Sequence, residues 1–123
     1  MKEHLIDSTE IAGRAFDVVL PTCTTVQYAY EVLGRDHEEL YRDYTHLNDY
    51  GRVIVSYYWY AVIMGIEELT EVNLDAVPAA LKHRNSLFPA ADANGNYVIT
   101  EDMKEDVLKA VNWTLKNPYN LPE

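Results

Sequence analysis

The chain has 123 residues, which is enough for one domain with a real hydrophobic core. Its 20 Asp and Glu against 10 Lys and Arg give a formal net charge of −10. Because this charge repels phosphate backbones and anionic membranes, we expect no nucleic-acid partner. The lone cysteine, Cys23, excludes an internal disulfide. Charged residues between Lys2 and Asp7 interrupt any apolar run, so the sequence predicts no signal peptide and leaves the compartment open.

The first third of the chain has the pattern of a short helix, a strand and a longer helix. We expect a helix from Ile6 to Ala12 and a buried strand from Phe16 to Leu20, which Pro21 ends because proline cannot donate to a ladder. A second helix is predicted to begin between Thr22 and Thr25 and to run to Leu33, with Gly34 as its stop. A strand followed by a helix is the order of a βα unit, where functional groups gather at the carboxyl end of the strand.

A long apolar helix occupies the middle of the sequence. It is predicted to start with a cap at Asn48 or Asp49, to run to Met64 and to end at Gly65. No charged residue occurs from Val53 to Met64, so we expect this helix to be buried on most sides. About twelve residues are too few for a membrane span, which needs roughly twenty. The run Tyr57-Tyr58-Trp59-Tyr60 suits ligand stacking, but aromatics around a buried helix favour packing in the core.

Beyond Gly65 the pattern is looser and predicts shorter elements. A short helix is expected from Leu74 to His83, and a turn followed by an extended piece from Asp92 to Thr100. Thr100 should cap a last helix that runs to Leu115. The apolar residues of this helix fall on one side: Val107, Leu108, Val111 and Leu115. With no internal repeat or linker, residues 1–123 are predicted to form a single domain or a partial domain.

One segment resembles a calcium loop without its full ligand set. Asp92, Asn94 and Asn96 match the first three ligand positions of an EF-hand loop. Tyr97 stands where that loop needs glycine, and Met103 stands where it needs a bidentate glutamate. The sequence therefore favours an ordinary Asn-Gly turn, and we expect neither a metal nor a cofactor.

The most informative segment is Leu40-Tyr41-Arg42-Asp43-Tyr44-Thr45-His46-Leu47-Asn48-Asp49-Tyr50-Gly51-Arg52, in which the aspartate and the histidine come just before the apolar helix. A carboxylate three residues before a histidine on a tight turn can accept the Nδ1 proton of the imidazole. This bond fixes the tautomer and leaves Nε2 free to take a proton from a nucleophile. Asp43 and His46 are therefore candidate catalytic residues. None of the serines lies in a recognisable nucleophile turn: Ser8, Ser56 and Ser86.

Three stretches together resemble the C-terminal third of SGNH hydrolases: Val18-Val19-Leu20-Pro21-Thr22-Cys23-Thr24-Thr25-Val26-Gln27, the stretch from Leu40 to Arg52 with its Tyr-Arg-Asp-x-x-His-Leu motif, and Tyr57-Tyr58-Trp59-Tyr60. The chain is most similar to an uncharacterised bacterial SGNH-like branch, in which an Ile-Pro-Thr-Gly-type segment precedes that motif. The resemblance covers roughly Ile6 to Gly65. It implies an α/β fold, the C-terminal part of a three-layer α/β/α sandwich, which in this chain is mostly helical with one or two short strands.

The same resemblance implies an activity. Members of the family hydrolyse esters, often acetyl or acyl groups on carbohydrates or lipids. His46 would be the general base and Asp43 its orienting partner. The nucleophilic serine of the family lies in a Gly-Asp-Ser motif near the start of the domain, and this chain has no such motif. Cys23 stands where this branch usually has glycine.

Three interpretations of the function follow. In the preferred one, the chain is the C-terminal portion of an SGNH-like esterase whose serine lies on a segment absent from this chain. The second is a non-enzymatic interaction or structural domain, in which Asp43 caps a turn and His46 is a satisfied core residue. The third, ranked last, is a cysteine hydrolase that uses Cys23, although nothing in the sequence brings Cys23 close to His46.

The uncharged helix also predicts self-association. If the stretch from Val53 to Met64 normally packs on a sheet whose other strands are missing, the chain has a large apolar surface that water does not tolerate. We therefore expect a homo-oligomer, most simply a homodimer in which residues 18–20 and 57–60 meet a symmetry mate. A small-molecule or carbohydrate ester is expected as substrate only for the full domain, and no membrane span is expected.

Overall fold

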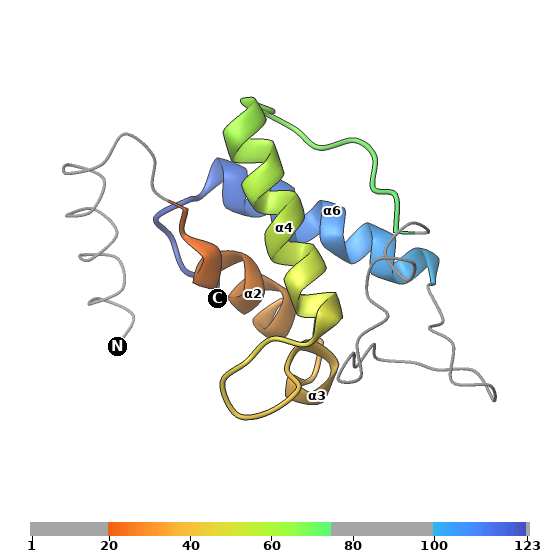
Figure 1. The fold of residues 1–123 in the computed structure, drawn as a ribbon. Helices are drawn as coiled ribbons and strands as arrows, with labels where there is room; N and C mark the ends of the chain where they lie inside the picture. The colour runs from red at the N-terminus through yellow and green to blue at the C-terminus, as the bar shows by residue number, and fades with distance from the viewer. Residues whose placement is uncertain (1–19, 75–99, 123) are drawn as a thin grey trace.

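The computed structural model describes residues 20–74 and 100–122, and this part of the chain is mostly helical. It contains four helices: α2 (Thr22–Glu31), α3 (His37–Leu40), α4 (Asp49–Met64) and α6 (Glu101–Lys116). Helices α2, α4 and α6 pack against one another in pairs, and the short α3 packs against α2 and α4 (Figure 1). The core between them contains fully buried side chains from several segments: Leu40, Tyr50, Ile54, Val107 and Val111.

The prediction of a helix-rich chain is confirmed for the described residues, but they show no α/β/α sandwich. Their β-structure is an isolated antiparallel bridge between Tyr41 and Leu47. Leu20, the last residue of the first predicted strand, belongs to no strand, and its carbonyl accepts a bond from the Thr22 amide at 2.7 Å. The rest of that strand and the predicted helix from Ile6 to Ala12 lie outside the described residues. So do all but the first residue of the helix predicted from Leu74 to His83, and all but the last residue of the turn and extended piece predicted from Asp92 to Thr100.

Helix α2 begins at Thr22 as predicted but ends at Glu31, two residues before the predicted end. The chain leaves the helix early because it closes with a tight turn through Gly34. This glycine has a φ of 70°, a left-handed conformation that side chains disfavour. The turn lets the Arg35 amide bond back to the Ala29 carbonyl at 3.0 Å, which satisfies one of the free carbonyls at the end of the helix.

Both predicted ends of α4 are confirmed. The Asn48 side chain caps the first turn, because its Oδ1 accepts a bond from the Gly51 amide at 2.9 Å. Its Nδ2 donates to the Glu39 carbonyl at 2.7 Å, so the same amide also fixes α4 to the end of α3. At the other end, Gly65 adopts a φ of 68° and its amide bonds back to Ala61. The local cap residues therefore set the length of this helix.

The predicted start of α6 is also confirmed, and the helix runs one residue beyond the predicted end. The Thr100 hydroxyl oxygen accepts a bond from the Met103 amide at 3.4 Å. Of the predicted apolar face, Val107 and Val111 are fully buried, while Leu108 and Leu115 are partly buried and pack against the core. This amphipathic pattern places α6 across the core beneath α4 (Figure 1).

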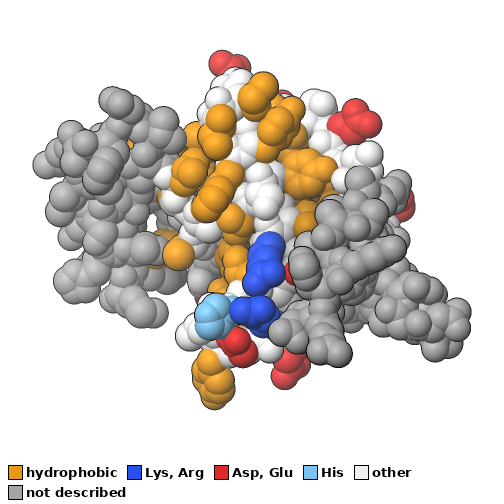
Figure 2. Space-filling model, viewed as in Figure 1, with side chains coloured by type: hydrophobic (Ala, Val, Ile, Leu, Met, Phe, Trp, Pro, Cys, Tyr) orange, Lys and Arg blue, Asp and Glu red, His pale blue; other side chains and the backbone are white. Residues whose placement is uncertain are grey.

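The expectation that α4 is buried on most sides is wrong. Helices α2 and α6 cover one face, and the last turns of α4 expose four large apolar side chains: Trp59, Tyr60, Ile63 and Met64. Figure 2 shows hydrophobic side chains gathered on this visible face. The Trp59 indole also donates to the Thr22 hydroxyl at 2.8 Å, so the polar atom of this exposed aromatic side chain has a hydrogen-bond partner. That a second copy of the chain covers this face stays a prediction. Among the described residues, no helix is long and apolar enough to cross a membrane.

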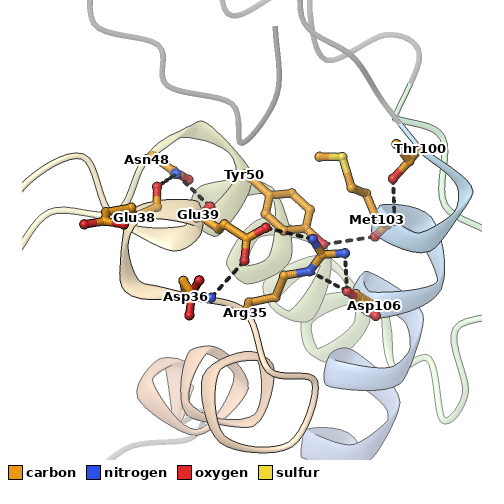
Figure 3. Close-up of polar contacts among 9 residues, drawn as sticks. All are labelled: Arg35, Asp36, Glu38, Glu39, Asn48, Tyr50, Thr100, Met103 and Asp106. Carbon is orange, nitrogen blue, oxygen red and sulfur yellow. Dashed lines mark hydrogen bonds and ion pairs between the residues drawn. The ribbon is translucent and has the colours of Figure 1, made fainter.

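A charged network joins helices α3, α4 and α6 (Figure 3). The Arg35 guanidinium lies 2.6 Å from Asp106 on α6 and 3.1 Å from Glu39 on α3. It also lies over the ring of Tyr50, 5.7 Å from the centroid, and the Tyr50 hydroxyl donates to the Met103 carbonyl at 3.3 Å. Burial raises the pKa of the Tyr50 hydroxyl, which keeps it neutral and able to donate. One arginine therefore links α3, α4 and α6.

Candidate functional site

The predicted catalytic pair lies on a closed loop between α3 and α4. The bridge between Tyr41 and Leu47 closes the loop, and the Arg42 amide bonds to the His46 carbonyl at 2.9 Å. At its base, the Asn48 amide bonds to the Leu40 carbonyl at 2.8 Å. Because Leu40 and Asn48 are both buried, the loop is anchored in the core although its tip is exposed.

The structure brings Asp43 and His46 together as the three-residue spacing predicts. The two oxygens of the Asp43 carboxylate lie 3.0 and 2.9 Å from Nδ1 of His46. The same carboxylate accepts backbone bonds from the amides of Thr45 at 2.9 Å and His46 at 2.8 Å. Asp43 therefore holds both the loop backbone and the imidazole ring.

These contacts define what the pair can do chemically. When Nδ1 of the neutral His46 ring donates to the carboxylate, Nε2 carries the lone pair and can act as a base. The side chains of His46 and Asp43 are 62% and 49% exposed, so a reacting group can approach the ring from solvent. Its exposure contradicts the idea that His46 is a satisfied core residue, but it leaves open a purely structural role for Asp43.

Acid titration should report how firmly the loop holds the carboxylate. Bonds from the Thr45 and His46 amides lower the pKa of Asp43 from 3.8 to about 2. Because the folded pKa lies below the unfolded one, these bonds stabilise the loop above pH 4 or so, and the contribution is lost as the pH falls through about 2. We expect the Asp43 side-chain NMR shift, and the amide shifts of Thr45 and His46, to titrate together with a midpoint of about 2. A midpoint near the ordinary value of 3.8 would contradict these bonds.

No serine or cysteine among the described residues is hydrogen-bonded to His46; the Thr45 hydroxyl lies 3.3 Å from Nδ1, the ring nitrogen that faces Asp43. The side chain of His46 bonds to Asp43 and Thr45 there, and Ser56 lies on the exposed side of α4. Cys23 is an exposed free cysteine in the first turn of α2, and no hydrogen bond in this part of the chain joins it to His46. Burial, together with the nearby Cys23, raises the pKa of Tyr41. Ser8 and Ser86 lie outside the described residues.

The described ranges also contain no group of three or more His, Cys, Asp or Glu side chains that could hold a metal ion. The ligand positions of the calcium-like segment, Asp92, Asn94 and Asn96, fall outside these ranges. Met103, at the position where a calcium loop needs glutamate, is buried in α6 and packs in the core. Its role is therefore structural.

A pocket that the sequence pattern does not reveal lies between α4 and the segment that follows it. This cavity of about 640 Å³, here called the Tyr57 pocket, is lined by three residues of α4 (Ser56, Tyr57 and Tyr60) and by the segment from Ile66 to Asn73. The Tyr57 hydroxyl donates to the Asn73 carbonyl at 3.0 Å and accepts from the Asn73 amide at 2.9 Å. The aromatic run was a sequence signal for this site, but the segment beyond Gly65 carries no pattern that reveals it.

The comparisons with known proteins assign neither site. No protein-family model, curated protein or solved structure matches the chain.

Proposed function

We propose that His46 and Asp43 form the general-base pair of an SGNH-type ester hydrolase. The observation that supports this proposal is the Asp43 carboxylate at 2.9 Å from Nδ1 of an imidazole ring that is open to solvent. The Tyr-Arg-Asp-x-x-His-Leu motif around the pair adds the resemblance to that family. The nucleophilic serine is proposed to lie on a polypeptide segment that is absent from this chain.

In the proposed reaction, Nε2 of His46 takes the proton of the serine hydroxyl as its oxygen attacks the ester carbonyl. The ester bond to the alcohol then breaks, and the imidazolium returns the proton to the departing alkoxide. Asp43 keeps its charge at neutral pH because its pKa is about 2, so it can stabilise the imidazolium and hold the ring in position. Water releases the acyl group by the same proton transfers in reverse order. By resemblance, the substrate class is an acyl ester of a carbohydrate or lipid.

The chain by itself should show no catalysed ester hydrolysis. Without a positioned serine and oxyanion donors, a base has nothing to activate. We expect it to hydrolyse p-nitrophenyl acetate no faster than its His46→Ala variant. Turnover that disappears in Cys23→Ala would instead support the cysteine hydrolase.

The positive test supplies the missing serine. The DNA upstream of the codon for Met1 is read for a Gly-Asp-Ser segment, and the two parts are expressed as one polypeptide. Its ester hydrolysis should fall by about a thousandfold in His46→Ala, because a positioned general base contributes about that much. His37→Ala is the matched control, since His37 is an exposed histidine of the neighbouring α3 that stacks on Tyr41. Equal activity in both variants would refute the proposal.

Asp43→Asn separates the catalytic role of Asp43 from a structural one. The amide oxygen of asparagine can still accept the bonds from the Thr45 and His46 amides, so the loop should keep its shape. The variant lacks the negative charge beside Nδ1, so the joined protein should lose activity by about a hundredfold or more. Unchanged activity would leave Asp43 as a turn cap only.

A further inference from the structure

The Tyr57 pocket has a wall that is held in place at two points. Beyond α4 the chain runs back past α6 without regular secondary structure (Figure 1). The Asn112 side chain of α6 accepts a bond from the Leu69 amide at 2.7 Å and donates to the Leu69 carbonyl at 2.8 Å. The Tyr57 hydroxyl makes the same pair of bonds with the backbone of Asn73. The side chains of Asn112 and Tyr57 thus bond to the backbone of this segment as a neighbouring β-strand would. They hold residues 69–73 in place without a ligand.

The lining of this pocket combines aromatic rings with negative charge. Tyr57 and Tyr60 supply two rings from α4, and the half-buried Ile66 and buried Leu69 supply aliphatic surface. Glu68 and Glu71 supply two carboxylates, while no basic residue lines the cavity. Glu68 pairs with Lys116 at 3.6 Å, whereas Glu71 makes no ion pair within the described part of the chain.

We propose that the Tyr57 pocket binds a small organic cation, an ammonium group that carries an apolar body. Ring faces attract a positive charge, and a carboxylate beside them adds to the attraction. The net charge of −10 raises the local concentration of cations and opposes anions. The volume of about 640 Å³ is that of a small-molecule site.

This proposal is independent of the hydrolase proposal. The pocket shares no residue with the loop that carries Asp43 and His46. Its first lining residue, Ser56, lies seven residues beyond the start of α4 at Asp49, which corresponds to about 10 Å along the helix axis. Either proposal can therefore fail without the other.

The test compares three probes of similar shape and different charge on the full chain: benzyltrimethylammonium, benzyl alcohol and phenylacetate. Binding is followed by amide chemical shifts in a ¹⁵N NMR titration. We expect the cation to bind at least about fivefold more tightly than the alcohol, and phenylacetate more weakly than either. The shifted amides should be those of residues 56–60 and 66–73.

Three variants of the pocket and one control variant show which side chains contribute to binding. Tyr60→Leu keeps an apolar side chain but removes a ring, and Glu71→Gln removes a charge; each should weaken the cation by about two- to fivefold. Neither should change the binding of benzyl alcohol by more than about twofold. Glu105→Gln is the matched control, because it removes an exposed carboxylate of α6 that lies outside the pocket. Asn112→Ala should weaken the cation and the alcohol together, because it releases the wall at Leu69.

The proposal has clear contrary outcomes. Equal affinity for the cation and the alcohol would overturn it, and so would cation binding that Tyr60→Leu and Glu71→Gln leave unchanged. Shifts confined to other surfaces would also overturn it. So would the absence of any shift at about 10 mM benzyltrimethylammonium, because a preformed pocket of this lining should bind at that concentration. Tyr60→Leu and Glu71→Gln change exposed residues, so these two variants should fold like the unmodified chain.

Discussion

Replacement of Arg35 by methionine is expected to lower the free energy of unfolding by about 3 kcal/mol and the melting temperature by about 10 °C. The side chains of Arg35 and Asp106 are only 18% and 12% exposed, and the substitution leaves the Asp106 carboxylate without its cation. It also removes the bond to Glu39 and the contact over the Tyr50 ring. Urea and thermal denaturation, followed by far-UV circular dichroism, measure this loss.

Two further variants show whether the loss comes from the buried pair. Lys109→Met removes the partner of Glu105 on the exposed side of α6, where both side chains are more than half exposed, and should change stability by less than about 0.5 kcal/mol. The double variant Arg35→Met with Asp106→Leu should recover much of the loss, since apolar side chains of similar size can replace a buried ion pair at little cost. Equal effects of Arg35→Met and Lys109→Met would show that the buried pair adds no stability.

Gly51→Ala is expected to destabilise the protein by about 2 kcal/mol although alanine is the better helix former. Gly51 lies in the first turn of α4, where helix propensity alone would favour alanine by about 1 kcal/mol. A Cβ atom there would lie 2.5 Å from the Leu40 carbonyl oxygen and 3.0 Å from the Leu47 side chain. The carbonyl is backbone and also accepts the Asn48 amide, so relief of the clash must move the loop that carries Asp43 and His46.

Helix propensity and the close contact predict opposite changes in stability for Gly51→Ala, so the direction of the measured change distinguishes them. Chemical denaturation gives the stability, and the Asp43 and His46 NMR signals report the loop; both should change together. Ser56→Ala is the control, because it adds alanine to the exposed side of the same helix and should change stability by less than about 0.5 kcal/mol. A Gly51→Ala variant that is more stable than the parent, with unchanged loop signals, would contradict the close contact.

The sequence predicted the features that depend on neighbouring residues. The caps at Asn48 and Thr100 and the stop at Gly65 involve bonds that span three or four residues, so the amino acids alone identify them. The pair of Asp43 and His46 is of the same kind, because a three-residue spacing on a turn brings a carboxylate to its own following amides and to the ring. Local geometry therefore sets this part of the candidate site.

The exposure of α4 shows where the sequence pattern misleads. An uncharged stretch predicts burial on most sides, yet Ile63 and Met64 are 69% and 63% exposed. Without charged side chains, burial of the helix carries no penalty for desolvating a charge. Burial still requires other elements of the fold that pack against the helix. Which side of the helix is covered depends on where α2 and α6 lie.

The amino-acid sequence by itself determined the helix ends and the pairing of Asp43 with His46, because each depends on hydrogen bonds within about one helical turn. Only the tertiary structure decided that Arg35 meets Asp106, which lies 71 residues away, and that Asn112 holds Leu69, which lies 43 residues away. Read alone, such polar side chains are typical of a solvated surface. They become a buried network and a pocket wall because the packing of α2, α4 and α6 removes water around them, and each polar atom must then find a partner in the protein.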